Sequence, residues 1–178
     1  MSAELSQTVS HALRHEPWVY ELELDEQGWV GVDALVEALR QERRWSAVTA
    51  DDVARMVATS SKQRHEIRDG RIRAVYGHSV PTLIVRTPGV PPELLFHGTS
   101  PTSAAVVLAD GLRPMRRQYV HLSTDTEMAH AVGSRKATPP TLLVVRALDA
   151  HEAGTAFYAG NAKVWLADHV PAAFIARL

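Results

Sequence analysis

The 178-residue chain contains no cysteine. Disulfide bonds, thiolate catalysis and zinc clusters ligated by cysteine are therefore excluded. No apolar run approaches the ~20 residues that span a bilayer, and the polar opening MSAELSQTVSHALRHEP lacks the apolar core of a signal peptide. We expect a soluble, cytoplasmic protein that does not act at a membrane.

Two nucleotide-binding signatures are also missing. The chain has neither a Gly-x-Gly-x-x-Gly fingerprint nor a Walker phosphate loop, so a nucleotide would have to be bound by other means. His11 and His15 stand four residues apart, a helical spacing that can bind zinc. Because the motif is not His-Glu-x-x-His and no third ligand accompanies the pair, we expect no metal.

The basic residues of the chain are clustered. Apolar residues make up 46% and charged residues 22%, the composition of a folded protein, and the formal net charge is -1. Between Lys62 and Arg73 five basic residues stand beside only two acids, and the segment GLRPMRRQY holds Arg113, Arg116 and Arg117 without an acid. Such clusters indicate local anion sites, although for any single arginine a solvated surface position is the commoner explanation.

The first part of the chain begins with a helical pattern. Apolar residues recur at helical spacing from Leu5 to Leu13, and Pro17 predicts that this helix ends near His15. The segment VYELELD, which follows, alternates between apolar and polar residues and predicts an extended strand.

Two further helices and a turn complete this half. VDALVEALR predicts a helix with Asp33 as its N-cap, and TADDVARMVA predicts another with Thr49 as its N-cap. Asp69 and Gly70 stand between two strand-like runs, which is a strong hairpin signal. Helices followed by a basic hairpin are typical of a winged helix, a fold associated with nucleic acids.

The segment Arg86–Glu93, RTPGVPPE, holds three prolines and a glycine and is the best linker candidate. The sequence therefore predicts a first domain over residues 1–85, a linker over 86–93 and a second domain over 94–178. After the linker, short strands and short helices are interspersed, which predicts an α+β arrangement. Two of these helices, SAAVVLADG and TDTEMAHAVG, are predicted to end at Gly111 and Gly133.

Two predicted strands of the second half carry polar residues. FHGTS places His97, Gly98 and Thr99 at a strand end, where glycine lets the backbone approach a ligand closely. VHLS places His121 and Ser123 in a similar position. Taken alone each motif is weak, because a structural turn explains the first and a hydrogen-bonded core histidine explains the second.

The ordered set of motifs is far more specific. LRHEP, KQRHEI, GHS, FHGTS, GLRPMRRQYVHLS, AVGSR and VWLADHVP occur in this order, together with LDEQGWV. From about Leu5 to Ile175 the chain resembles the RNA 2′-phosphotransferase family, also called tRNA 2′-phosphotransferase. The resemblance implies an N-terminal winged-helix lobe and a C-terminal NAD-binding lobe of the ADP-ribosyltransferase type.

The resemblance also implies a reaction. The family removes an internal 2′-phosphate from RNA, such as the one left at a tRNA splice junction, with NAD as co-substrate and without metal. The 2′-phosphate attacks the anomeric carbon of the nicotinamide ribose, nicotinamide leaves, and an RNA-2′-phospho-ADP-ribose intermediate forms. The ribose 2″-hydroxyl then attacks the phosphorus, which gives 2′-hydroxyl RNA and ADP-ribose 1″,2″-cyclic phosphate. Nothing in the sequence suggests more than a monomer.

The functional residues of the family carry over to positions of this sequence. The catalytic tetrad falls on Arg14, His15, Arg64 and Arg117. The NAD-binding positions fall on His97, Gly98, Thr99, His121, Ser123, Gly133, Arg135 and Val164, with His78 and Ser79 as weaker candidates. The RNA-binding candidates are Lys62, Arg64 and Arg116. The sequence departs from the family pattern at Gln7, His65 and Tyr119, where a lysine, an aromatic residue and a histidine are common.

These residue types suit the implied chemistry. A phosphate monoester, with a second pKa near ~6, is mostly a dianion at neutral pH and has to be held rather than deprotonated. Arginine holds it well because its planar fork matches phosphate oxygens. The second step moves a proton, a role for which histidine is suited and which we assign to His15. The alternative for Arg14 and His15 is a surface ion pair and a helix C-cap.

Two other functions remain open. An ADP-ribosyltransferase that modifies nucleic-acid phosphate ends would stop after the first step, and the complete tetrad disfavours it because only the second step needs all four residues. A winged-helix nucleic-acid-binding protein without activity is disfavoured by the motifs HGTS, VHLS and VGSR. Release of nicotinamide from NAD in the presence of 2′-phosphorylated RNA separates the three functions.

Overall fold

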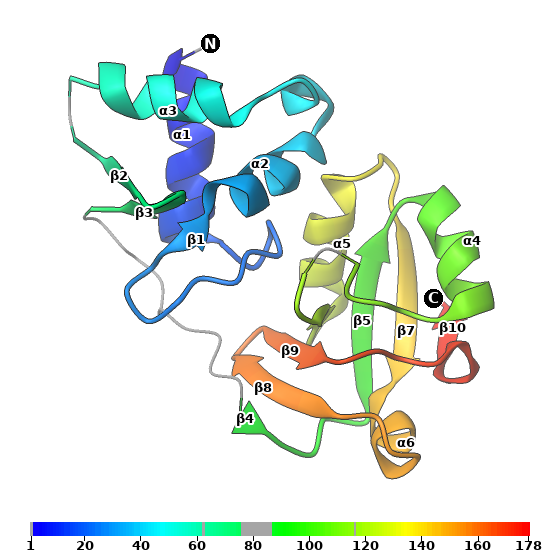
Figure 1. Cartoon of the computed structure of the whole chain (residues 1–178). Coiled ribbons are helices and arrows are strands. Elements are labelled where there is room, and N and C mark those ends of the chain that lie inside the picture. Colours follow the sequence, from blue (N-terminus) through cyan, green and yellow to red (C-terminus); the bar gives the residue numbers. More distant parts are fainter. Residues whose placement is uncertain (1, 62, 76–86, 116) are drawn as a thin grey trace. The chain divides into compact units, whose positions relative to one another are not determined.

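The computed structural model describes residues 2–61, 63–75, 87–115 and 117–178 (Figure 1). The chain divides into two compact units, Met1–Leu83 and Ile84–Leu178, and each is described by itself. Both units combine helices with an antiparallel sheet, in agreement with the expected α+β class. Among the described residues, no helix has the length and apolar character needed to cross a membrane.

Unit 1 is built from helices packed on a three-stranded sheet with the strand order β1-β3-β2 (Figure 1). Its helices are α1 (Ser2–Ser10), the π-helical turn η1 (His11–His15), α2 (Val32–Arg40), the 3-10 turn η2 (Arg43–Trp45) and α3 (Ala50–Thr59). Its strands are β1 (Val30–Gly31), β2 (His65–Arg68) and β3 (Arg71–Ala74). The apolar positions at helical spacing point inward, and Val9, Leu13, Leu35, Leu39, Val53 and Ile72 are completely buried.

Three local predictions for unit 1 are confirmed. The first helical segment ends at His15. Thr49 caps α3 reciprocally, because its hydroxyl accepts from the Asp52 N–H (3.2 Å) and the Asp52 carboxylate accepts from the Thr49 N–H (3.0 Å). Asp69 and Gly70 turn the chain between β2 and β3 with φ values of 51° and 71°, the left-handed pair that a two-residue hairpin turn needs.

The prediction of an extended strand for VYELELD is wrong. Pro17 opens a turn, and its carbonyl accepts from the N–H groups of Tyr20 (3.1 Å) and Leu22 (3.0 Å). Glu21 has a φ of 52°, which no extended strand contains. Tyr20 and Leu22 are nevertheless buried. The alternation therefore reports burial correctly, while local hydrogen bonds decide the backbone conformation.

The prediction that Asp33 caps α2 is also wrong. The N-cap is Gly31, the last residue of β1, and Asp33 lies exposed in the first turn of the helix. The Val32 N–H donates to the carbonyl of Gly70 in the hairpin turn (2.9 Å). The hairpin thus satisfies an N–H group at the start of α2, and the strand passes into the helix without a capping side chain.

Unit 2 contains a seven-stranded antiparallel sheet with the order β10-β7-β5-β6-β9-β8-β4. The strands are β4 (Thr87–Pro88), β5 (Leu94–Thr99), β6 (Val120–Ser123), β7 (Thr141–Arg146), β8 (Phe157–Asn161), β9 (Val164–Ala167) and β10 (Ile175–Arg177). The helices are α4 (Pro101–Asp110), α5 (Thr126–Ser134), α6 (Ala147–Glu152) and the 3-10 turn η3 (Ala172–Phe174). Gly111 ends α4 as predicted. Within the segment interpreted as a linker, β4 pairs with β8 at the edge of the sheet.

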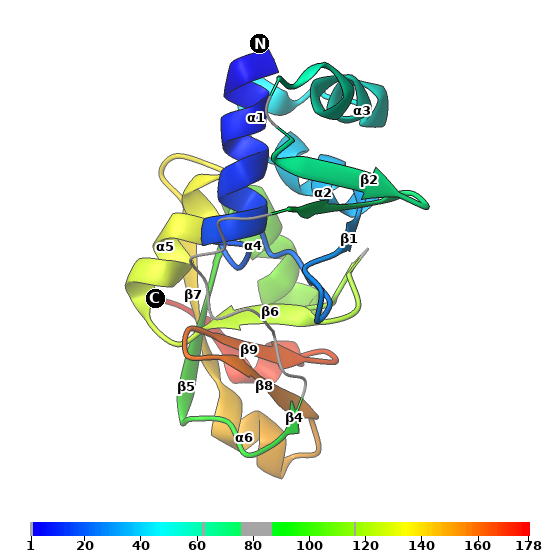
Figure 2. The same cartoon turned by 90° about the vertical axis from the view of Figure 1, so that its left-hand side faces the viewer.

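The sheet of unit 2 has a seam between β5 and β6. Strand β5 pairs with β7 along Leu94–Thr99, and β6 pairs with β9 along Val120–Ser123. In the described part of the chain, β5 and β6 share the single pair Phe96–Ser123. Figure 2 shows the consequence, since β5 and β7 run up the view whereas β6, β9 and β8 run across it. The C-terminal half of β5, His97–Thr99, therefore lies where the two strands separate.

Helix α5 lies directly against β5, and α4 lies on the opposite side of β5 and β7 (Figure 1). A Cβ on Gly98 would stand 1.7 Å from the carbonyl oxygen of Ala129 in α5, and a Cβ on Gly133 would stand 3.0 Å from the Gly98 carbonyl carbon. Both positions are glycine because the helix and strand backbones touch. Gly133 does not end α5 as predicted, because the helix continues to Ser134.

We expect Gly98→Ala to destabilise unit 2 by about 3 kcal/mol or more, because the added methyl group has no space and the backbone of β5 has to move. Gly89→Ala is a matched control, since its Cβ would meet the Trp165 ring at an ordinary 3.6 Å, and we expect a change within ~0.5 kcal/mol. Native-state hydrogen exchange of the β5 amides measures both effects. Equal effects would show that α5 does not restrict β5 through Gly98.

Candidate active site

Arg14 stands in the last turn of η1 and is tied to the start of β2. Its Nη2 donates to the backbone carbonyl of Arg64 over 2.9 Å. The same carbonyl accepts the N–H of Val75, which follows β3, at 3.0 Å. The turn is π-helical, since the Glu16 N–H reaches back five residues to the His11 carbonyl (3.0 Å), and such turns are frequent at functional sites. Two of the predicted catalytic arginines are therefore linked by a hydrogen bond.

His65, the residue after Arg64, is buried between the same elements. Its Nε2 lies 3.1 Å from the Oγ of Ser10 in α1, and only 2% of the residue is exposed. Burial, reinforced by the positive charges of Arg14 and Arg64, lowers the pKa of His65 from 6.5 to about 4. His65 is therefore neutral at neutral pH, and it adds no third charge beside the two arginines.

The other described arginines of the basic cluster between Lys62 and Arg73 are paired with acids. The pairs are Arg68–Asp69 (3.7 Å), Arg71–Asp25 (2.6 Å) and Arg73–Glu66. Within the part of the chain that the structure describes, no carboxylate pairs with Arg64. Among the described arginines of this cluster, Arg64 is therefore the candidate for binding an anion, and Arg14 is linked to its backbone.

His15 follows Arg14 and is exposed. Its ring lies 6.1 Å, centroid to centroid, from the ring of His11. His11 is held on both sides, because its Nδ1 lies 3.1 Å from the Tyr20 hydroxyl and its Nε2 lies 3.2 Å from the Glu16 carboxylate. His15 thus has an ordered neighbour while its own imidazole stays accessible to a substrate.

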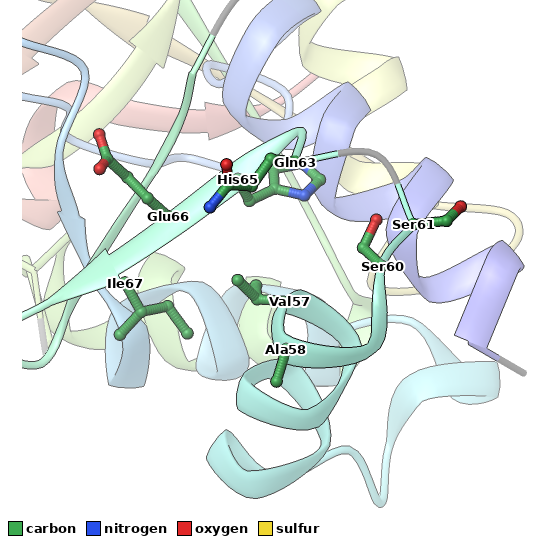
Figure 3. A pocket seen from close by; sticks show the side chains of 8 residues that line it. All are labelled: Val57, Ala58, Ser60, Ser61, Gln63, His65, Glu66 and Ile67. Atoms are coloured by element: carbon green, nitrogen blue, oxygen red, sulfur yellow. The ribbon is translucent and has the colours of Figure 1, made fainter.

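A groove of about 580 Å³ opens between the end of α3 and β2 (Figure 3). Its lining residues are Val57, Ala58, Ser60, Ser61, Gln63, His65, Glu66 and Ile67. The one carboxylate among them, that of Glu66, is engaged by Arg73. Neither Arg14 nor Arg64 lines the groove. Among the described residues that line the groove there is no lysine or arginine, and we do not assign the phosphate to it.

His97 fills the seam between β5 and β6 in unit 2. It is buried, and its Nδ1 lies 3.1 Å from the carbonyl oxygen of His121. Because a carbonyl only accepts, Nδ1 of His97 is the donor in this contact. Thr99, two residues later, is buried and pairs with Thr141 of β7. Gly98, between them, projects to the opposite face of the strand, toward α5.

Ser123 lies at the point where the two halves of the sheet meet. It is buried and pairs with Phe96 of β5 and with Val164 of β9. His121 precedes it by two residues on β6 and shares its face of the strand. Backbone pairing therefore places His97, His121, Ser123 and Val164 near the seam, on three different strands. His121, Ser123 and Val164 lie on the face of the sheet that Phe96 and Gly98 share, and His97 lies on the other face.

The remaining predicted residues have separate positions. Gly133 contacts the backbone of Gly98, and the half-buried Arg135 follows the last turn of α5. Arg117 is half-buried in the loop before β6, where its N–H donates to the Pro114 carbonyl (3.1 Å). Four predicted residues, Lys62, His78, Ser79 and Arg116, lie outside the described residues.

Ser10 and Tyr20 belong to the arrangement in unit 1, although no motif in the sequence identifies them. Ser10 precedes Arg14 by four residues, a spacing that places both on one helical face. That spacing is the signal that could have found Ser10. Tyr20 lies in a segment whose alternation predicts a strand, so its contact with His11 is not readable from the pattern.

Comparison with known proteins relates the chain to one family. A family model described as "RNA 2'-phosphotransferase, Tpt1 / KptA family" matches residues 1–169. A protein of Bacillus thuringiensis subsp. konkukian named "Probable RNA 2'-phosphotransferase" is 53% identical over 172 residues, which cover 97% of this chain and 93% of that protein. A protein of the same name from Acetivibrio thermocellus is 47% identical over 173 residues, which cover 97% and 95%. One from Pyrococcus horikoshii is 35% identical over 171 residues, which cover 96% of each.

The match of the family model runs through both units and includes the arginine pair of unit 1 and the seam of unit 2. The coverage of the relatives is similarly complete on both sides of each comparison. On these grounds the chain belongs to the RNA 2′-phosphotransferase (Tpt1 / KptA) family.

Proposed function

We propose that the protein transfers an internal 2′-phosphate of RNA, such as the one at a tRNA splice junction, to NAD in the cytoplasm. The products are 2′-hydroxyl RNA, nicotinamide and ADP-ribose 1″,2″-cyclic phosphate. The observation that carries the proposal is the arginine pair of unit 1. Arg14 is fixed to the carbonyl of Arg64, both cations act on the neutral His65, and no described carboxylate pairs with Arg64. Two arginines linked in this way suit a multiply charged anion.

The architecture of each unit supports the finer assignment of the lobes. In unit 1, three helices and an antiparallel hairpin suit a winged-helix lobe. In unit 2, a sheet that separates at a seam lined by His97 and Ser123 suits an NAD-binding lobe of the ADP-ribosyltransferase type. Of the residues assigned to the phosphate, Arg14 and Arg64 belong to unit 1 and Arg117 belongs to unit 2.

In the first step an oxygen of the RNA 2′-phosphate forms a bond to the anomeric carbon of the nicotinamide ribose. The carbon–nitrogen bond breaks, and nicotinamide leaves as a neutral molecule with the bonding electron pair. The phosphate is already a dianion and needs no base. We assign its binding to Arg14, Arg64 and Arg117, each contact being worth about 1.5–3 kcal/mol.

In the second step the ribose 2″-hydroxyl attacks the phosphorus, and the RNA 2′-oxygen leaves. The hydroxyl loses a proton and the leaving oxygen gains one, so one imidazole can accept the first and donate the second. We assign this role to His15, whose ring is exposed. The arginines act here as well, because negative charge develops on the phosphoryl oxygens as phosphorus becomes five-coordinate.

The seam of unit 2 fits the ribose of NAD. The bond from Nδ1 of His97 to the His121 carbonyl fixes the orientation of the ring at the seam. Ser123 carries a hydroxyl on the neighbouring strand. These residues would orient the ribose so that its anomeric carbon meets the incoming phosphate.

The reaction is tested by incubating the protein with NAD and an oligonucleotide that carries one internal 2′-phosphate. We expect nicotinamide and ADP-ribose 1″,2″-cyclic phosphate in equal amounts, measured by mass spectrometry. A 2′-hydroxyl oligonucleotide is the control and should release neither. Nicotinamide release with an ADP-ribosylated RNA as the final product would instead indicate an ADP-ribosyltransferase, and binding without nicotinamide release would indicate a non-catalytic nucleic-acid-binding protein.

Arg64→Ala should slow the second step about 100-fold and the first step less, because a preformed dianion can still attack a strongly electrophilic carbon. The substitution removes the side chain beyond Cβ and keeps the backbone carbonyl that anchors Arg14. His15→Ala should act in the same way through loss of the proton carrier. The branched RNA-2′-phospho-ADP-ribose species should accumulate, which a denaturing gel of end-labelled RNA detects.

The matched control for Arg64→Ala is Arg68→Ala, at the other end of β2, where the arginine is exposed and paired with Asp69. We expect the rates of the first and the second step in Arg68→Ala to stay within about twofold of the wild type. If Arg64→Ala and His15→Ala leave the substrate unreacted without any branched species, both residues serve the first step or substrate binding, and the division of roles is wrong.

His97→Ala should raise the KM for NAD by about tenfold or more, because it removes the ordered imidazole at the seam, while the affinity for 2′-phosphorylated RNA stays nearly constant. His130→Ala is the control in the same unit, where the histidine is exposed on α5 and contacts Ser134. Titration of each ligand by calorimetry gives both affinities. Loss of RNA affinity with unchanged NAD affinity would contradict the assignment of the seam to NAD.

A further inference from the structure

We propose that Ser10 and His65 form a positioning pair that sets the direction in which Arg14 and Arg64 present their guanidinium groups to the 2′-phosphate. This inference rests on the proposed function, because it concerns the same phosphate site. Neither residue is assigned a contact with the substrate. They act through the two arginines.

The geometry provides two parallel links between the first helical segment and β2. Ser10 and Arg14 lie four residues apart on α1 and η1, while Arg64 and His65 are consecutive at the start of β2. Ser10 Oγ meets His65 Nε2 at 3.1 Å, and Arg14 Nη2 meets the Arg64 carbonyl at 2.9 Å. Two links fix the rotation of the helix relative to the strand, whereas one link alone would allow the helix to pivot.

A neutral imidazole suits this arrangement, because a protonated ring would add a third positive charge beside the two arginines. Arg14 of η1 and Arg64 before β2 are the charged groups that act on His65, and both oppose its protonation. The neighbours of His65 on the other two elements carry no charge. Val57 of α3 lines the same groove as His65, and Ala74 of β3 is the strand partner of His65. A neutral imidazole supplies a polar atom to Ser10 without increasing the repulsion between the arginines.

The pair differs from ordinary core packing in that it depends on a hydrogen bond at a defined atom. Glutamine can place an amide nitrogen near the position of Nε2, so His65→Gln preserves a partner for Ser10 and does not titrate. His65→Leu preserves burial and removes the bond. Ser10→Ala removes the bond from the other side. Ser6→Ala is the control, because Ser6 is a buried serine one turn earlier on the same helix.

The experiment measures equilibrium binding of two oligonucleotides that differ only in one internal 2′-phosphate, without NAD. We expect Ser10→Ala and His65→Leu to weaken binding of the 2′-phosphorylated RNA about tenfold, about 1.4 kcal/mol, with the 2′-hydroxyl RNA unaffected. His65→Gln should stay within about threefold of the wild type, and Ser6→Ala should not change. Equal losses for both RNAs, equal losses in Ser6→Ala and Ser10→Ala, or no rescue by glutamine would overturn the proposal.

Turnover of the same variants separates this inference from the proposed function. If the wild type binds the 2′-phosphate selectively but releases no nicotinamide from NAD, the proposed reaction fails while the positioning pair stands. If the wild type turns over and Ser10→Ala and His65→Leu keep wild-type KM for RNA and wild-type kcat, the reaction stands and the pair has no positioning role.

The neutral state of His65 is tested by stability against pH. Its pKa in the folded protein, about 4, lies below the ordinary 6.5, so the unfolded chain binds more protons between these values and stability falls as the pH is lowered through that window. Relative to His65→Gln, the urea midpoint of the wild type should therefore decrease from pH 6.5 to about 4. Tryptophan fluorescence reports it, since Trp18, Trp29 and Trp45 belong to unit 1. A constant difference would show that the imidazole is not held neutral and would remove the basis of the positioning pair.

Discussion

One backbone oxygen, the carbonyl of Arg64, connects the segments that form the charged centre of unit 1. It accepts the N–H of Val75 and so closes the base of the hairpin, and it accepts the guanidinium of Arg14 and so anchors the end of the first helical segment. A carbonyl has two lone pairs and can serve both donors. Since the acceptor belongs to the backbone, the link survives any substitution of the Arg64 side chain. The position of the first arginine is thus independent of the chemical identity of the second.

Unit 2 relies on contact between backbones in a comparable way. Gly98 and Gly133 let α5 touch β5, and this contact holds the C-terminal half of β5 in place after it has separated from β6. The ring of His97 then bridges the opening to the His121 carbonyl. A sheet that parts along one pair of strands exposes polar backbone groups, and a buried histidine is one means of satisfying them. His97 can therefore both supply a hydrogen bond to a backbone carbonyl of the fold and orient a substrate.

The parts of the fold that depend on neighbouring residues were predictable from the sequence. The Thr49 cap, the Asp69-Gly70 turn and the end of the first helical segment at His15 follow from spacing and turn chemistry alone. The conformation of VYELELD and the start of α2 were not, because the turn at Pro17 and the bond from Val32 to the hairpin compete with local preference.

The candidate site was predictable in its residues but not in their contacts. Ordered motifs placed Arg14 and Arg64 in one functional set, and the structure links them by a hydrogen bond. The pairing of three neighbouring arginines with acids was not readable, since Asp25 is distant in sequence from Arg71. Glycine at position 98 was interpreted as room for a ligand, whereas the structure shows a packed helix at that position. A glycine indicates close approach without identifying what approaches.

The internally paired arginines of the hairpin have a consequence for how the protein meets RNA in salt. Binding to single-stranded nucleic acid loses about 0.7 log units of affinity per tenfold rise in salt for each phosphate neutralised, because counterions are released. Arginines paired with Asp25, Glu66 and Asp69 are less available to RNA phosphates, and a net charge of -1 exerts little attraction at long range. Under the proposed function we therefore expect a shallow salt dependence of RNA binding and weak competition by long unmodified RNA.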